Sequence, residues 1–216
     1  GLFSYHLLYF SALRLAPAAQ AGLIAYLWPL LIVVFSGLLP SERLRTGHLL
    51  GALLGFGGAA LIITDGATGL SGDYLPGYLL ALLAAFTWAG YSVLSRLVGT
   101  APTASVAVFC LATSALSLPL HLAFEETVLP TTPMGWASII GLGLGPVGLA
   151  FYVWDIGCKQ GDIQLLGTSS YAAPLLSTLA LVVAGIAAPT ITLLWAATCI
   201  TGGALIAARA SFVKND

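Results

Sequence analysis

Apolar residues dominate this chain in long runs, which short stretches rich in turn-forming residues separate. A helix needs about 20 apolar residues to cross a bilayer, with a range of roughly 17 to 25. The pattern predicts eight helical segments, at approximately residues 1–15, 18–39, 48–64, 75–97, 104–124, 136–156, 165–186 and 193–208. Every break between them contains Pro, Gly, Asp or Ser, and all the breaks are short. We therefore expect an all-α integral membrane protein without a separate soluble domain.

The composition supports a lipid-facing surface. Hydrophobic residues make up 59% of the chain and charged residues 7%, whereas about 25% charged residues is ordinary for a globular domain. So few charged side chains cannot cover the outer surface of a protein in water. The lipid bilayer is therefore the expected partner. The net charge of -1 and the lack of a Lys/Arg run argue against a nucleic acid partner. Cys110, Cys158 and Cys199 form no CxxC motif, and we expect no metal site and no cofactor.

Basic residues gather on one side of the predicted membrane, and short cytoplasmic loops are known to collect Lys and Arg. Because each helix crosses the membrane, alternate loops lie on the same side. The loops and the C-terminal tail on one side carry Arg43, Arg45, Arg96, Lys159, Arg209 and Lys214. The opposite side carries Arg14, together with Asp65, Asp73, Glu125 and Glu126. The side of Arg43 and the C-terminus is therefore predicted to be cytoplasmic.

An internal repeat appears when the sequence is shifted by the 145 residues that separate Pro29 from Pro174. Without a gap, Tyr26 then meets Tyr171, and Gly57-Gly58 meets Gly202-Gly203. The shift moves each segment five segments along, and an odd number reverses its direction through the membrane, as in the inverted repeats of many transporters. We expect residues 1–66 to hold the last three helices of one repeat and residues 74–210 the five helices of the other. On this count the architecture is 5+5 helices, the chain begins inside a helix, and two helices precede Gly1.

The two copies contain recognisable motifs. The first copy has ALRLAPA at residues 12–18, YLWPL at 26–30, Glu42-Arg43 and a glycine-rich segment at 51–58. The second copy has GCKQG at 157–161, SYAAPL at 170–175 and Gly202-Gly203, but has Ala187-Ala188 in place of Glu42-Arg43. With these motifs the chain resembles the drug/metabolite transporter superfamily, whose members carry two EamA-type repeats of five helices. Within the superfamily, YHLLY at 5–9 and YLWP at 26–29 look most like aromatic amino acid exporters of the bacterial inner membrane. The resemblance implies a multi-pass exporter in that membrane.

Several aromatic residues and one histidine are predicted to lie at mid-depth. At 1.5 Å per residue, Tyr5 and His6 lie about 14 to 15 Å from the end of their segment, and Trp28 lies about 15 Å from the start of its own. Trp and Tyr normally mark the headgroup level, and an ionisable residue at mid-depth is a functional candidate. Their neighbours and repeat mates complete a predicted substrate-binding set of Tyr5, His6, Tyr9, Tyr26, Trp28, Trp88, Tyr91, Trp154 and Tyr171.

Plainer structural interpretations stay open for these positions. His6 is also compatible with a neutral ring bonded to a neighbouring helix, and Trp28 with a packed or lipid-facing side chain, although lining a cavity is favoured for both. Trp154 is equally compatible with an interfacial anchor. Pro29 and Pro174 remove a backbone donor and are expected to kink their helices. The freed carbonyl could bond a neighbouring group or a substrate, but a structural kink is favoured.

Two further features have alternative interpretations. Asp155 and Lys159 have the i, i+4 spacing of an ion pair at the membrane surface, while a carboxylate that couples transport to protons is the alternative. The glycines at 51–58 and 202–203 favour close helix packing within the chain over dimerisation.

The absences narrow the function. No Lys or Arg lies at mid-depth to bind a phosphate, and no clustered catalytic set such as HExxH is present, so a sugar-phosphate carrier and an enzyme are both disfavoured. The sequence predicts a secondary transporter that exports aromatic or hydrophobic amino acids by alternating access, with the direction taken from the resemblance. The alternative is a broad exporter of drugs or small metabolites, such as lipophilic cations. Proton coupling and oligomeric state are left open.

Overall fold

The computed structural model describes residues 1–64 and 69–212, and all regular elements in these ranges are helical. The first half contains α1 (Leu2–Leu15), α2 (Ala18–Ala25), α3 (Trp28–Ser36), α4 (Thr46–Thr64), η1 (Gly72–Tyr74), α5 (Leu75–Leu97) and α6 (Ser105–Phe124). The second half contains α7 (Pro133–Leu144), η2 (Gly145–Leu149), α8 (Ala150–Gln160), α9 (Ile163–Ser169), α10 (Ala172–Val183) and α11 (Ile191–Phe212). The expected all-α fold is confirmed.

Among the described residues, seven helical stretches are long and apolar enough to cross a membrane, instead of the eight predicted. They are Ala18–Ser36, Thr46–Thr64, Gly72–Leu97, Ser105–Phe124, Pro133–Gln160, Ile163–Val183 and Ile191–Phe212. The first predicted segment forms α1, whose 14 residues fall below the length of a spanning helix.

Two of these stretches are broken near their middle. The helix is interrupted at Tyr26 and Leu27, just before Pro29, and again at Ser170 and Tyr171, just before Pro174. Pro29 and Pro174 then lie in the first turn of α3 and α10, where the missing N–H group costs no helical hydrogen bond. Each stretch is therefore two short helices with a joint near its middle.

A third irregularity was not predicted. The stretch Pro133–Gln160 changes to a π turn at Gly145–Leu149, which contains Pro146. Proline cannot donate the regular helical hydrogen bond, so a wider turn accommodates it there.

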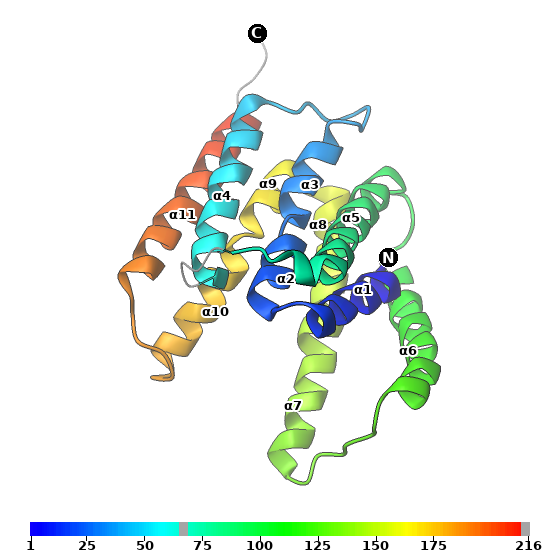
Figure 1. The fold of residues 1–216 in the computed structure, drawn as a ribbon. Coiled ribbons are helices and arrows are strands. Elements are labelled where there is room, and N and C mark those ends of the chain that lie inside the picture. Colours follow the sequence, from blue (N-terminus) through cyan, green and yellow to red (C-terminus); the bar gives the residue numbers. More distant parts are fainter. Residues whose placement is uncertain (65–68, 213–216) are drawn as a thin grey trace.

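The helix starts repeat along the chain with the predicted spacing. Ala18 of α2 and Ile163 of α9 are 145 residues apart, as are Thr46 of α4 and Ile191 of α11. Helices α4 and α11 lie side by side and run in opposite directions (Figure 1), with Gly47 facing Ala210 at one end.

Glycines bring α4 and α11 into backbone contact. A Cβ atom added to Gly51 would lie 2.5 Å from the carbonyl oxygen of Gly203, and one added to Gly203 would lie 2.5 Å from that of Gly51. A Cβ at Gly55 would meet the ring of Tyr171 at 2.7 Å. The predicted packing within the chain is confirmed at these positions. Gly57 differs, because it is exposed and a Cβ added there would meet no atom of the described residues within 4 Å.

The two ends of the helical bundle carry different charges. We call the end with Glu42, Arg96 and the end of α11 the Glu42 end, and it lies at the top of Figure 1. The opposite end, with Arg14 and Glu125, is called the Glu125 end. Asp65, Lys214 and the domain boundary at residue 66 fall outside the described residues.

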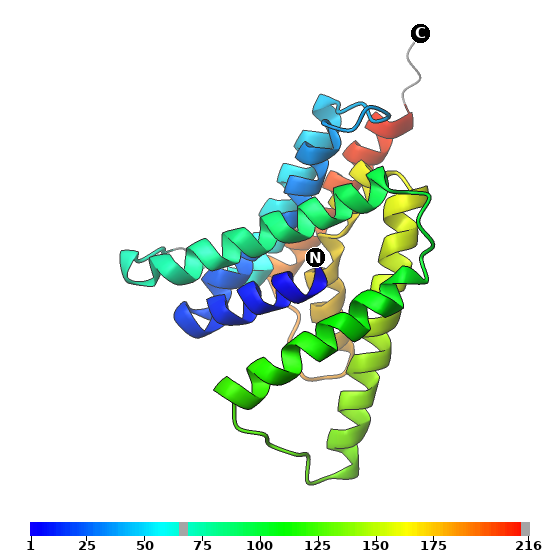
Figure 2. The same cartoon turned by 90° about the vertical axis from the view of Figure 1, so that its right-hand side faces the viewer.

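Helices α6 and α7 lie at the edge of the fold (Figure 2), and most of their side chains are exposed. Leu111, Leu142 and Phe124 are 72%, 56% and 74% exposed. Exposed apolar side chains along whole helices are typical of a surface in contact with lipid.

Candidate functional site

All nine residues of the predicted substrate-binding set belong to one connected group of ring contacts. Helix α1 supplies Tyr5, His6 and Tyr9, α3 supplies Trp28, α5 supplies Trp88 and Tyr91, α8 supplies Trp154, and the helix joints supply Tyr26 and Tyr171. We call this group the aromatic cluster.

Trp88 is the hub of the aromatic cluster and is 7% exposed. Its ring centroid lies 5.2 Å from that of Tyr5, 5.5 Å from Tyr91, 6.0 Å from Trp154 and 6.3 Å from Trp28. Trp28 and Trp154 also meet edge to face at 5.3 Å. Such spacings are those of favourable aromatic pairs, so the rings hold one another in place.

On α1 the rings follow the helix periodicity. Tyr5 and Tyr9, four residues apart, stack with centroids 5.8 Å apart and an interplanar angle of 8°. His6 Nδ1 lies 2.8 Å from the carbonyl oxygen of Leu2, so this nitrogen is the protonated one. The histidine therefore bonds to its own helix, whereas the plainer interpretation expected a bond to a neighbouring helix.

The two helix joints meet at Tyr26 and Tyr171, whose rings lie 6.4 Å apart. The backbone N–H of Leu30 donates to the Tyr171 hydroxyl at 3.0 Å, and Tyr171 is fully buried. The Tyr171 hydroxyl thus links the α10 joint to the first turns of α3.

Trp154 packs inside the fold, against side chains from α3 and α5. Its indole N–H donates to the Ser92 hydroxyl at 3.1 Å, and its ring packs against Trp28 and Trp88. Tyr152, on the same helix, is 42% exposed and lies outside the aromatic cluster's ring contacts.

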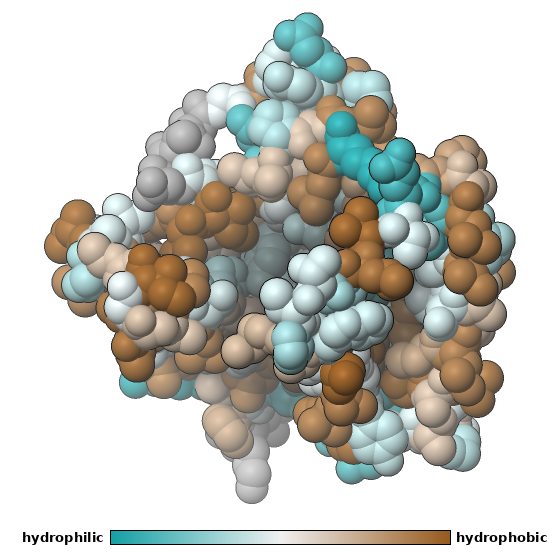
Figure 3. All heavy atoms as spheres, turned by 90° about the horizontal axis from the view of Figure 1, so that it is seen from below, coloured by the Kyte–Doolittle hydropathy of each residue, from teal (hydrophilic) through white to brown (hydrophobic). Residues whose placement is uncertain are grey.

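A cavity of about 770 Å³ lies between α1 and α6. Of the nine predicted residues, His6 alone is in its wall, which also contains Phe10, Phe124 and Phe151. The cavity reaches Arg14 and Glu125. The surface of the molecule seen from below has a hollow near its middle, among hydrophobic and polar side chains (Figure 3).

Phe151 joins this cavity to the aromatic cluster. Its ring lies 5.9 Å from His6 and 5.5 Å from Trp88. Sequence reasoning missed it because one Phe in an apolar run has no distinguishing pattern. A second cavity of about 440 Å³ has Tyr91, Asp155 and Lys159 in its wall.

At the Glu125 end, Arg14 of α1 forms an ion pair with Glu125 beyond α6, and the two side chains are 59% and 43% exposed. His121 Nδ1 lies 2.8 Å from the other carboxylate oxygen of Glu125. The hydrogen bond from His121, and then Arg14, hold the pKa of the Glu125 carboxyl below its ordinary value.

The predicted pair of Asp155 and Lys159 is present at 2.6 Å, and it is buried inside the fold. The two side chains are 1% and 6% exposed. Ser95 donates to the other Asp155 oxygen at 2.6 Å, and Lys159 also donates to the carbonyl of Ala101 at 2.9 Å. Packing against α5 and the loop before α6 buries the pair. Among the described residues, no three His, Cys, Asp or Glu side chains lie where they could hold a metal ion.

Comparison with known proteins gives a family and named relatives. Residues 1–64 and 75–209 match the EamA-like transporter family. The chain is 56% identical over 209 residues to the aromatic amino acid exporter YddG of Ancylobacter novellus, covering 96% of this chain and 72% of that protein. It is 27% identical to the Escherichia coli protein of the same name, covering 88% of this chain and 66% of that protein.

Two further relatives bear on the comparison. The chain is 28% identical to the biotin transporter of Escherichia coli over 75% of its own length and 55% of that protein. A solved crystal structure matches with a TM-score of 0.92 and 56% identity, covering 96% of this chain and 74% of the solved one.

Proposed function

This chain belongs to the EamA-like transporter family, and from that premise we propose that it exports aromatic and other hydrophobic amino acids across the bacterial inner membrane. The observation that carries the proposal is the 56% identity to a protein named as an aromatic amino acid exporter. The aromatic cluster adds a physical reason, because an aromatic side chain finds several ring faces and edges at mid-depth.

The proposed architecture is an inverted repeat of 5+5 helices, with residues 1–66 in the first repeat and residues 74–210 in the second. The family matches the chain twice, once on each side of residue 70. The 145-residue spacing of the helix starts and the antiparallel packing of α4 and α11 support the inversion. The Lys and Arg bias supports a cytoplasmic Glu42 end, which includes the C-terminus.

The aromatic cluster and the polar groups beside it bear on the chemistry of the substrate. Aromatic pairs contribute about 0.5 to 1.5 kcal/mol each beyond buried area, so two or three rings supply a useful part of the affinity for a phenylalanine or tryptophan side chain. Polar groups near these rings are the hydroxyls of Tyr5, Tyr9 and Tyr26 and the ring of His6, which suit the amino and carboxylate groups of a zwitterion. The joints between α2 and α3 and between α9 and α10 are the hinges that rocking of the repeats would use.

The test is transport by the purified protein in liposomes. We expect labelled phenylalanine and tryptophan to leave loaded vesicles much faster than threonine. Trp28→Ala removes ring contacts to Trp88 and Trp154 and is expected to lower the rate about tenfold, the equivalent of roughly 1.4 kcal/mol. The matched control is Trp195→Ala on α11, where the side chain is 60% exposed and should leave transport unchanged.

Transport of a lipophilic cation and of biotin distinguishes the proposed function from its alternatives. Movement of a lipophilic cation without movement of phenylalanine would show that the broad drug exporter is the right function. Biotin has an apolar body and a carboxylate but lacks an ammonium group, and a relative carries its name. Preference for biotin over phenylalanine would overturn the proposal that a zwitterion is recognised.

A further inference from the structure

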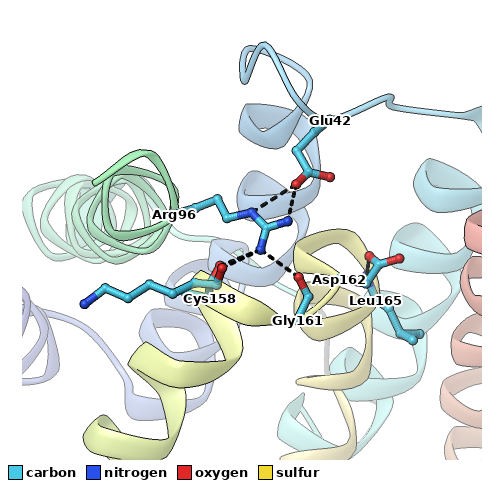
Figure 4. A network of polar contacts seen from close by, with 7 residues as sticks. Glu42, Arg96, Cys158, Gly161, Asp162 and Leu165 are labelled. Carbon is cyan, nitrogen blue, oxygen red and sulfur yellow. Dashed lines mark hydrogen bonds and ion pairs between the residues drawn. The ribbon is translucent and has the colours of Figure 1, made fainter. Parts of the chain in front are cut away.

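Arg96, near the end of α5, joins three segments at the Glu42 end (Figure 4). Its Nε donates to Glu42 Oε1 at 3.0 Å. Its Nη1 donates to the carbonyls of Lys159 and Gly161 at 2.9 and 2.8 Å, and to that of Cys158 at 3.3 Å. The last carbonyls of a helix have no partner within the helix, and a cation there is favourable. Arg96 therefore caps α8 while it holds Glu42.

Glu42 is also held from α9. Gln164 is 3% exposed, and with its amide oriented to match its neighbours, its nitrogen donates to Glu42 Oε2 at 3.3 Å. The side chains of Arg96 and Glu42 are 21% and 12% exposed. Water competes little for these groups, so both oxygens of the Glu42 carboxylate have charge-assisted or buried partners.

These contacts connect the two repeats. Glu42 follows α3 in the first repeat, whereas Arg96 and Gln164 belong to the second. Any rocking that separates the repeats at this end must break the Glu42 contacts.

Among the described residues, no counterpart of these contacts is found at the other end, although the two proposed repeats share sequence. The 145-residue shift carries Glu42 to Ala187 and Gln164 to Ala19, and neither alanine can form a polar contact through its side chain. Among the described residues, the ion pair between α1 and α6 at the Glu125 end is that of Arg14 and Glu125. It is exposed, and exposed pairs contribute little in water. The cavity between α1 and α6 reaches this end.

We propose that Glu42, Arg96 and Gln164 form a one-sided latch, which holds the cytoplasmic entrance closed and keeps the empty transporter in the state open to the outside. The inference rests on the proposed function, since it requires alternating access and a cytoplasmic Glu42 end. Substrate from the cytoplasm then loads only when the latch is released, so the strength of the latch sets the fraction of molecules that can load.

Two native cysteines can report, through their rate of labelling, how open each end of the helical bundle is. Cys158 is fully buried beside Arg96, and Cys110 lies in the wall of the cavity between α1 and α6.

The test variant is Glu42→Gln, which keeps the size of the side chain, removes its charge and leaves the contacts of Arg96 with the end of α8 in place. Coupling contacts of this kind correspond to about 5- to 150-fold in an equilibrium, so we expect maleimide labelling of Cys158 to accelerate about tenfold. Labelling of Cys110 should fall at the same time, because opening one side closes the other. Mass spectrometry quantifies each cysteine separately.

The matched control is Arg14→Gln, which breaks the exposed ion pair at the opposite end and should not accelerate Cys158 labelling. Faster labelling of Cys158 without a fall at Cys110 would indicate local fraying and would overturn the latch. So would unchanged labelling in a Glu42→Gln protein with an unaltered melting temperature, or an equal effect of Arg14→Gln. Labelling needs no substrate, so a protein that shows the reciprocal change but does not transport phenylalanine would refute the proposed function and leave the latch intact.

Discussion

The close contact of α4 and α11 makes Gly51→Ala a sharp test of the packing. The added methyl group would lie 2.5 Å from the carbonyl oxygen of Gly203 and 3.0 Å from the Cβ of Ala207. The carbonyl belongs to the backbone of a helix, so no side-chain rotation relieves the contact. The two helices must move apart along this seam.

The size of the effect follows from two opposing contributions. Overpacking a well-packed site costs about 1 to 3 kcal/mol, while replacing Gly by Ala inside a helix gains up to about 1 kcal/mol. Gly57→Ala, on the same helix, has the second contribution alone, because nothing lies within 4 Å of its position. The difference between the two variants isolates the contact, at about 1 to 3 kcal/mol in favour of Gly57→Ala.

Reversible unfolding in mixed micelles, with SDS as the denaturant and tryptophan fluorescence as the readout, measures the two free energies of unfolding. Helices persist in SDS, so the propensity contribution is small and cancels between the variants. If Gly51→Ala were as stable as Gly57→Ala, α4 and α11 could not be in backbone contact, and the seam described above would be wrong.

Two more predictions concern buried polar groups. Tyr171→Phe leaves the Leu30 N–H without its acceptor and is expected to cost about 1 to 3 kcal/mol of unfolding free energy in the same assay. Tyr78→Phe removes a buried hydroxyl that has no partner among the described residues, so it should be neutral or stabilising; equal losses for both would refute this account. Asp155→Asn or Lys159→Met alone leaves one buried charge unpaired and should cost about 3 to 5 kcal/mol, whereas the double variant should recover most of the loss. If the double variant were no more stable than either single variant, the pair would not be the reason for the loss.

Depth along a helix was predictable from the sequence, because the rise per residue is fixed. That arithmetic placed Tyr5 and Trp28 at the same level, and the structure brings them into one cluster through Trp88. The direction in which each ring points was not predictable. It depends on how α1, α5 and α8 rotate against one another, and this packing puts His6 and Phe151 in the cavity wall while Trp88 becomes a hub.

The Asp155–Lys159 pair shows the same division between local and long-range information. Its i, i+4 spacing predicted the contact, since these positions are neighbours on any helix. Its burial depends on Ser95 and Ala101, which come from α5 and the loop before α6. Likewise, Glu42 and Arg96 are 54 residues apart, and no local pattern connects them.

A latch at one end cannot by itself make a transporter export. It shifts the balance between two states of the empty protein, and a passive carrier still equilibrates its substrate in whichever direction the gradient runs. Its consequence is kinetic asymmetry. A protein that rests closed at the cytoplasmic end loads from that side only in the minor state, so the apparent affinity there is reduced in proportion to the fraction of molecules that are open.

Glu42→Gln should therefore lower the apparent KM for phenylalanine on the Glu42 side of oriented vesicles and raise it on the other side. Net accumulation should remain unchanged in both proteins, since a mutation at the latch adds no energy source. Accumulation that depended on Glu42 would show that this carboxylate takes part in coupling, and that it does more than hold the entrance closed.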